Sequence, residues 1–215
     1  MWTLFQLADS AFPTGSFAHS AGLEAAAQAG EIGGSDDVRG FAHDAIWQAG
    51  FGALPLLGAA HRDAAALPFL DARADAFLAN HVANRASRTQ GRAFVATAAR
   101  VFPERLGPLA AAAVGLKLHL APVWGAALSA LEIPLSDAQR VFLWSTARNV
   151  LSAGVRLGLL GTHEAQAMLA GLGPLLDEVH AGCGELGVDD LAQPAPIADL
   201  LQGTHDRLYS RLFQS

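Results

Sequence analysis

Apolar side chains recur at helical spacing along almost the whole sequence, and this pattern limits the folds open to the chain. No segment alternates apolar and polar residues over the length of a strand with β-branched enrichment. Hydrophobic residues make up 52% of the 215 positions, and alanine and leucine, which favour helix, supply this content. The pattern predicts an all-α fold, one irregular helical bundle domain of about nine to ten helices over residues 1–215.

Local start and stop signals place the expected helices. Ser16 is expected to cap a helix that Gly30 ends, and Ser35 to cap the next. Ser136 and Gln139 form a capping-box pattern before a long helix. Beyond the helix starting at 35, we expect helices at 17–29, 51–63, 68–102 (continuous or bent), 106–118, 123–131, 136–155, 162–171, 174–186, 197–201 and 206–212.

Charge and cysteine content narrow the class of protein. The formal net charge is −6, so the chain has no basic footprint for nucleic acid. Lys117 is the single lysine beside 13 arginines, which suits paired interfaces, although GC-rich coding would give the same bias. Cys183 is the single cysteine, which fits a reducing compartment. We expect a cytosolic protein without a signal peptide, and prolines interrupt the most apolar stretch, 106–135, which argues against a membrane span.

No motif of a known chemistry stands out in the sequence. The chain lacks a phosphate-binding loop, a G-x-G-x-x-G fingerprint and a nucleophile elbow around Ser16. Its eight histidines form no H-x-H or H-E-x-x-H pair, and His180 and Cys183, three positions apart, give at most two metal ligands. His19 and His119 are weak metal candidates, and His119 reads as a core or interface histidine. These absences indicate a protein whose role is contact, not catalysis.

The stretch FPTGSFAHSAGLE, residues 12–24, gathers polar side chains near the start of the chain. Pro13 and Gly15 are typical of a turn. A capped helix after that turn would place His19 and Leu23 on one face. This interpretation accounts for Gly15 and Ser16 but leaves His19 unexplained.

That stretch also opens a set of five sequence blocks that resembles the UreF family of urease accessory proteins. The first block, LFQLADSAFPTGSFAHSAGLEAA, is similar to the family's N-terminal signature. Four more follow in the family's order, namely NRASRTQGRAF, HLAPVWG, NVLSAGVRLGLLGTHEAQ and HDRLYSRLFQS. At four positions the sequence differs from the residue that the family often has, namely Ser16, Ala21, Trp124 and Gly154. Each block alone is weak, but five in one order over nearly the whole chain are highly specific.

The resemblance implies an all-α homodimer with no catalytic activity of its own, which acts in the cytoplasm during nickel insertion into urease. It implies three partners: UreD (also called UreH), the GTPase UreG and, through UreD, the urease apoenzyme. It implies no tightly bound cofactor, because Ni²⁺ is handled by the complex, and neither a nucleic-acid nor a membrane partner. The alternative role is to activate or gate GTP hydrolysis by UreG, with an arginine finger as one route.

The resemblance also selects residues for partner interfaces. A C-terminal tail, residues 203–215 or so, is expected to dock UreD through an exposed cationic and apolar end, and Tyr209 to pack the terminal helix. His19 and Ser20 are expected to face UreG or a nickel path. Arg156 is expected in a polar network at an interface or, equally, in a structural ion pair. The expected interface residues are Phe17, His19, Ser20, Arg85, Gln90, His119, Arg156, Tyr209, Arg211, Leu212 and Phe213.

Overall fold

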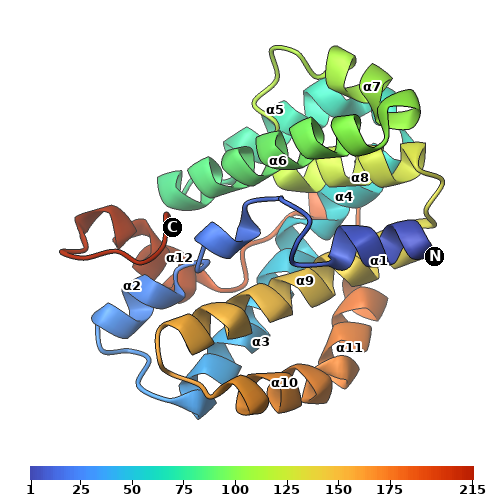
Figure 1. The fold of residues 1–215 in the computed structure, drawn as a ribbon. Helices are drawn as coiled ribbons and strands as arrows, with labels where there is room; N and C mark the ends of the chain where they lie inside the picture. Colours follow the sequence, from blue (N-terminus) through green and yellow to red (C-terminus); the bar gives the residue numbers. More distant parts are fainter.

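The computed structural model describes residues 1–215 and confirms the all-α prediction, with twelve α-helices, four short 3₁₀ helices and no strand (Figure 1). The 3₁₀ helices are Ser16–Ala18, Ala64–Ala66, Val188–Asp190 and His205–Arg207. The α-helices are α1 (Trp2–Ala8), α2 (Leu23–Gln28), α3 (Ser35–Gly52), α4 (Leu54–Arg62), α5 (Leu67–Phe77), α6 (His81–Val101), α7 (Pro103–Ala112), α8 (Leu120–Ala130), α9 (Leu135–Arg156), α10 (Thr162–Gly171), α11 (Gly173–Cys183) and α12 (Pro196–Gly203).

The long helix α9 crosses the middle of the molecule and organises the packing (Figure 1). Helices α3, α10 and α11 pack on one side of it, and α4 and α8 connect it to α5, α6 and α7 on the other. The buried face of α9 carries Leu143, Ala147, Val150 and Leu151, which belong to one continuous hydrophobic core. One core shared by both groups of helices makes the chain a single packed unit.

Helices α4 and α8 approach each other unusually closely, because α8 carries a glycine at the contact. A Cβ atom on Gly125 would lie 2.1 Å from the backbone oxygen of Leu57. Any larger residue would therefore force the two helices apart. Pro55 lies in the first turn of α4, where its missing N–H is not needed.

The predicted count of helices was low for two reasons. The expected helix 68–102 is two helices, because the side-chain oxygen of Asn80 accepts hydrogen bonds from the backbone N–H groups of Val82 and Ala83 and starts α6. The second reason is α1, which falls before the first expected helix.

Three predicted caps are wrong. Ser16 is the first residue of the 3₁₀ helix Ser16–Ala18 and makes no capping hydrogen bond, since Gly15 takes the N-cap position. Ser35 is the first residue of α3 and makes no capping hydrogen bond, since Gly34 takes the N-cap position. The Ser136–Gln139 capping box does not form, because α9 starts after Pro134 and the buried Gln139 side chain donates to the backbone oxygen of Gly184 at 2.7 Å. A tertiary partner outcompetes the local cap in this case.

The apolar stretch 106–135 is divided between α7 and α8. None of the helices combines the length and the hydropathy that crossing a bilayer requires.

Candidate functional site

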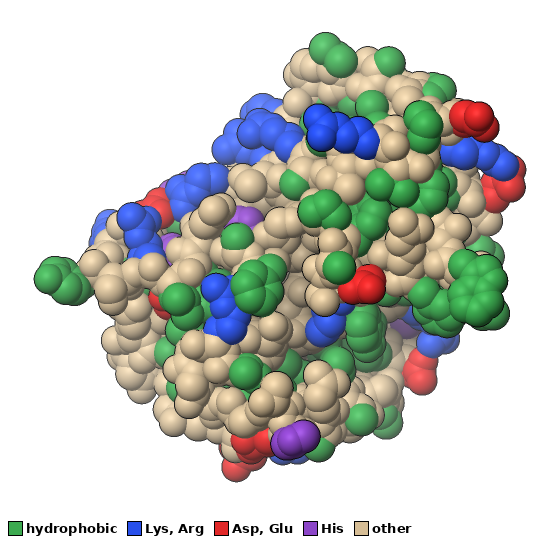
Figure 2. Space-filling view, viewed as in Figure 1, with side chains coloured by type: hydrophobic (Ala, Val, Ile, Leu, Met, Phe, Trp, Pro, Cys, Tyr) green, Lys and Arg blue, Asp and Glu red, His purple; other side chains and the backbone are tan.

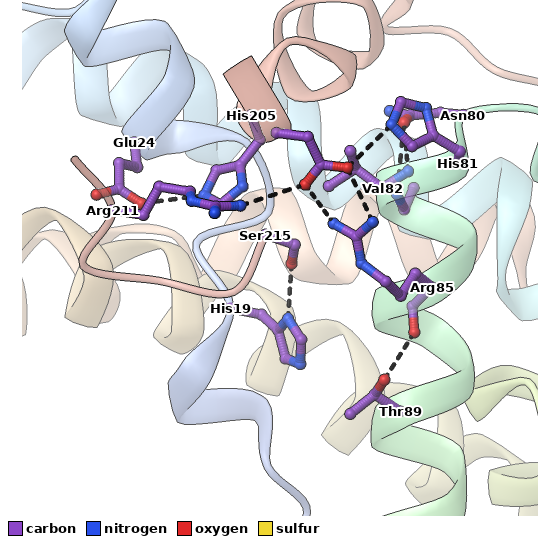
Figure 3. Close-up of polar contacts among 12 residues, drawn as sticks. His19, Glu24, Asn80, His81, Val82, Arg85, Thr89, His205, Arg211 and Ser215 are labelled. Atoms are coloured by element: carbon purple, nitrogen blue, oxygen red, sulfur yellow. Dashed lines mark hydrogen bonds and ion pairs between the residues drawn. The ribbon is translucent and has the colours of Figure 1, made fainter. Parts of the chain in front are cut away.

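The candidate site lies where the N-terminal loop, residues 9–22, meets the C-terminal tail, defined by the structure as residues 204–215 (Figure 3). The predicted helix 17–29 is wrong in its first half, since only α2 from Leu23 is α-helical. His19 is extended, and Ala21 and Gly22 adopt left-handed backbone angles, with φ of 54° and 94°. Gly22 is required there, because a Cβ would also lie 2.8 Å from Cβ of Gln202 in α12. His19 and Leu23 therefore do not share a helix face.

The tail pairs with this extended loop through backbone and side-chain hydrogen bonds. The backbone N–H of Ser20 donates to the backbone oxygen of Ser215 at 2.6 Å, and the Ser20 hydroxyl donates to the same oxygen at 2.8 Å. The N–H of Gln214 donates to Ala18 O at 2.8 Å. Nδ1 of His19 lies 2.6 Å from the Ser215 hydroxyl. These contacts bury His19, Ser20 and Ser215.

Glu24 anchors the tail from the first turn of α2. Its side chain is 2% exposed, and its carboxylate accepts hydrogen bonds from Nε2 of His205 at 3.0 Å and from the backbone N–H groups of Leu212 at 2.6 Å and Phe213 at 3.1 Å. These bonds replace the intrahelical bonds that the predicted helix 206–212 needs. That helix is consequently wrong, and only the short 3₁₀ turn His205–Arg207 forms.

Asp206 connects the tail to α6 on the outer side of the junction. Its carboxylate accepts two hydrogen bonds from Arg85, at 2.9 and 2.7 Å, and lies 3.2 Å from Nε2 of His81 and 3.5 Å from Nη1 of Arg211. The hydrogen bonds from Arg85 are the largest cause that lowers the pKa of Asp206 to about 2. The predicted site residue Arg85 thus holds the tail in place and remains partly exposed.

The tail presents a different face to solvent from the one expected. Tyr209 is fully exposed, so the prediction that it packs a terminal helix is wrong. Phe213 is buried, so the prediction that it belongs to the exposed end of the tail is wrong. Leu212 and Arg211 are exposed as predicted. The outward surface of the tail therefore consists of Tyr209, Arg211 and Leu212, and Phe213 packs into the protein beneath it.

Arg156, in the last turn of α9, joins the loop to the tail. Its guanidinium carbon lies 4.0 Å from the ring centroid of Phe17 and 4.1 Å from that of Phe213, and Nη1 donates to the backbone oxygen of Phe17. Both rings present their faces to the cation. No carboxylate lies within 4 Å of Arg156, so the alternative of a structural ion pair is wrong.

A cavity of about 260 Å³ lies beneath the junction and is lined in part by His19, Gln90, His119 and Ser215. His119 is fully buried, with Nδ1 3.2 Å from the Ser87 hydroxyl and Nε2 3.2 Å from Oδ1 of Asp75. The prediction of a core histidine is therefore confirmed, and both ring nitrogens of His119 have polar partners.

Burial lowers the pKa of both cavity histidines. The pKa of His19 falls to about 4, mainly through desolvation, with Arg85 and His205 adding repulsion. Desolvation also lowers the pKa of His119, partly offset by Asp75. Both rings are neutral at pH 7, and neutral imidazole binds metals. Neither joins a group of three or more His, Cys, Asp or Glu side chains placed to hold an ion.

Glu24, His205 and Asp206 hold the junction together, and none of them is among the site residues predicted from the sequence. Glu24 gave a weak signal as the one charge in an alanine-rich run. Its partner His205 is 181 residues away, and no local pattern reveals such a pair. His180 and Cys183 lie on α11 as ordinary packed residues, the reading the sequence favoured: Nε2 of His180 lies 3.2 Å from Gln139 Oε1, and Cys183 is buried against Gly50.

Comparison with known proteins gives a consistent result over the whole chain. The sequence profile of the UreF family matches residues 32–173. Urease accessory protein F of Oryza sativa subsp. indica is 34% identical over 220 residues, which cover 99% of this chain and 84% of the rice protein. Urease accessory protein F of Arabidopsis thaliana is 34% identical, covering 100% of this chain and 92% of its own length. Urease accessory protein UreF of Rhodopseudomonas palustris is 33% identical over 100% of this chain and 93% of its own length.

Proposed function

The chain belongs to the UreF family of urease accessory proteins, and from this premise we propose that it bridges UreD and UreG while nickel is inserted into urease. Membership of the family assigns the chain a role in urease maturation as an accessory protein and not as a catalyst. The bridging role, the two partners and the state of the chain as a homodimer in the cytoplasm are our proposals.

The observation that carries the proposal is the tail, because it turns a chain terminus into a fixed surface. Glu24 and Asp206 hold the tail from two sides, while Arg211 and Leu212 point outward. An exposed leucine beside an arginine on a rigid base suits a protein interface. We assign this surface to UreD.

A second exposed apolar surface lies at the other end of the molecule, on α1. Met1, Trp2 and Phe5 are exposed, and the rings of Trp2 and Phe5 pair edge to face with centroids 6.1 Å apart. Figure 2 shows large hydrophobic side chains gathered on one side of this face. A bridging protein needs two separate contact surfaces, and α1 supports a second contact, to UreG or to a second copy of the chain.

Nickel is cargo in this proposal. The chain's own residues supply no three-ligand group, so the complex and not this chain alone would hold the ion. The neutral His19 and His119, which line one cavity, are the residues of this chain best suited to contact Ni²⁺ in transit.

Co-expression with UreD and UreG, followed by co-purification, tests the bridge. We expect Leu212→Asp to lose UreD and to keep UreG, because it places a charge in the UreD contact. Val114→Asp is the control, since Val114 is also an exposed apolar residue but lies after α7, away from the tail. Deleting residues 211–215 is a poorer test, because it also removes the buried Phe213. If the unaltered chain retains neither partner, the bridging role is wrong.

Activation of UreG through an arginine finger gains no support from Arg156. A finger must reach into a partner's active site, whereas Arg156 is held between two aromatic rings and bonded to Phe17 O. GTP turnover by UreG, measured with and without this chain, separates the roles. If this chain binds UreG and changes GTP turnover little, the result agrees with the bridging role. A large rise in GTP turnover would favour a regulatory role.

A further inference from the structure

A groove of about 510 Å³ runs along the front of the molecule between the N-terminal loop, α9 and α10. Figure 2 shows this face hollowed over α9, with basic side chains set into the hollow. The charged side chains that line the groove are two arginines, Arg148 and Arg156, and no aspartate or glutamate lines it. We call it the arginine groove.

Neither arginine is neutralised within the chain. No carboxylate lies within 4 Å of either guanidinium, although the chain carries a net charge of −6. Asp9 attracts Arg148 from beyond that distance. Partly buried arginines are usually paired with an acid. Two unpaired ones in one groove of an acidic protein leave a local excess of positive charge.

Most of the hydrogen-bonding capacity of these arginines is unused. Arg148 donates to the backbone oxygen of Ala8 and, at 3.4 Å, to Oδ1 of Asn149, whereas Arg156 donates to Phe17 O. A guanidinium carries five N–H donors, so each keeps at least three for another acceptor. These bonds also fix the side chains before any ligand arrives, which lowers the entropy lost on binding.

The spacing of the two arginines defines the ligand. They are eight positions apart on one helix, which corresponds to a rise of about 12 Å. A single phosphate cannot span that distance. An extended peptide rises about 3.4 Å per residue, so acidic side chains four positions apart fall about 14 Å from each other on one face. Ser10, Thr14, Ser152 and Gln166 line the groove and suit hydrogen bonds to a peptide backbone.

We propose that the arginine groove binds an extended acidic segment of a partner protein, with one carboxylate on Arg148 and another on Arg156. The inference rests on the proposed function, because it assigns one of the bridged partners to a particular groove. Apolar side chains in the groove, among them Phe12 and Leu169, accept the residues between the two acids. The groove is separate from Leu212, which we assign to UreD.

The test measures binding of the full-length chain to purified UreD, UreG and urease apoenzyme. The variant is the double substitution Arg148→Glu and Arg156→Glu, and the control is Arg73→Glu, an exposed arginine on α5 that does not line the groove. We expect the double variant to lose at least about tenfold in affinity for one partner, while the control binds normally. The affinity of the unaltered chain for that partner should also fall with added salt.

Several outcomes would overturn the proposal. If the folded double variant binds all three proteins with unchanged affinity, the groove does not bind a partner. The proposed bridging role is not affected by that result. Loss of self-association instead of partner binding would identify a second copy as the occupant. Millimolar inorganic phosphate that binds the chain but not the double variant, without displacing any partner, would indicate a small-anion site. If the unaltered chain binds none of the three, the proposed function fails and the groove assignment fails with it.

Arg156→Lys tests whether the groove needs the shape of the guanidinium or only its positive charge. Lysine keeps the charge but has no planar fork, and it stacks less well between Phe17 and Phe213. We expect this variant to bind the partner more weakly than the unaltered chain and more tightly than Arg156→Glu. Equal binding by the lysine variant and the unaltered chain would show that charge alone matters.

Discussion

Nε2 of His205 lies 3.0 Å from Oε2 of Glu24, although 181 residues separate the two in sequence. Both side chains are buried, and the same carboxylate also takes the N–H groups of Leu212 and Phe213. One acidic side chain therefore ties α2 to the tail. The outward surface of the tail therefore depends on an interaction that is buried inside the protein.

Glu24→Ala should destabilise the junction strongly, because it leaves three hydrogen-bond donors, two of them fully buried, without an acceptor. A buried donor left without an acceptor costs about 1–3 kcal/mol, so we expect a total loss of about 3 kcal/mol. Urea denaturation measures the loss in the free energy of unfolding, and amide hydrogen exchange at Leu212 and Phe213 reports the release of the tail. Glu31→Ala is the control, since Glu31 is exposed and has no such partners. A cost below about 1 kcal/mol would show that the tail is not held by Glu24.

His19 should make stability depend on pH between 6.5 and 4. Its pKa is lowered from 6.5 in the unfolded chain to about 4 in the folded protein, mainly by desolvation. The unfolded chain binds the proton more readily than the folded protein, so protonation of His19 lowers the free energy of unfolding. This loss is absent above pH 6.5, grows as pH falls, and levels off below about pH 4. The expected loss of unfolding free energy is about 3 kcal/mol.

His19→Gln should flatten that slope, and the free energy of unfolding measured at intervals from pH 7 to pH 4 is the readout. Part of the slope remains, because burial lowers the pKa of His119 and His180 as well. His43→Gln is the control, since His43 is exposed. An identical slope in His19→Gln and the unaltered chain would contradict a buried, neutral His19.

The Arg85–Asp206 pair should contribute modestly to holding the tail. Its geometry is bidentate, but the two side chains are 43% and 33% exposed, so water screens the attraction. A double-mutant cycle with Arg85→Ala and Asp206→Ala should give a coupling of about 1 kcal/mol, smaller at high salt. The coupling should disappear as pH falls from 3.8 toward about 2, where Asp206 takes up a proton. A coupling that survives below pH 2 would refute this assignment.

Gly125→Ala should be among the most damaging single substitutions in the chain. The added Cβ would lie 2.1 Å from Leu57 O, so α4 and α8 must separate. We expect a loss of about 3 kcal/mol or more. Gly40→Ala in α3 is the matched control, because no atom lies within 4 Å of its added Cβ. That control should gain up to about 1 kcal/mol from helix propensity, and equal effects of the two substitutions would contradict the close packing.

The periodicity of apolar residues was sufficient to predict the all-α class and the positions of most helices. The helix at 162–171 was predicted to the residue, since α10 lies between a glycine before it and a change in pattern after it. The helix at 17–29 failed because Ala21 and Gly22 take left-handed angles that alanine-rich sequence does not signal. Its composition favoured helix, but the pairing of Ser20 with Ser215 favoured an extended loop.

The candidate site was predictable as a set of sequence blocks but not as an arrangement. His19, Arg85 and Arg156 were selected, and each lies at the junction. What joins them are contacts between residues far apart in the sequence, such as Arg85 with Asp206, which are 121 positions apart. Such contacts depend on the packed core and leave no periodic signal. The exposed Leu212 and the buried Phe213 are adjacent in sequence and both bond to Glu24, but only the Phe213 ring packs inward, against Arg156.

The long sequence separation within the Glu24–His205 pair also orders events during synthesis. Ribosomes add about 5 to 20 residues per second, so His205 emerges roughly 10 to 40 seconds after Glu24. During that interval α2 and the N-terminal loop have no tail to pair with, and the surface carrying Arg211 and Leu212 does not yet exist. A nascent chain that still lacks the tail would therefore be unable to recruit a partner through this surface.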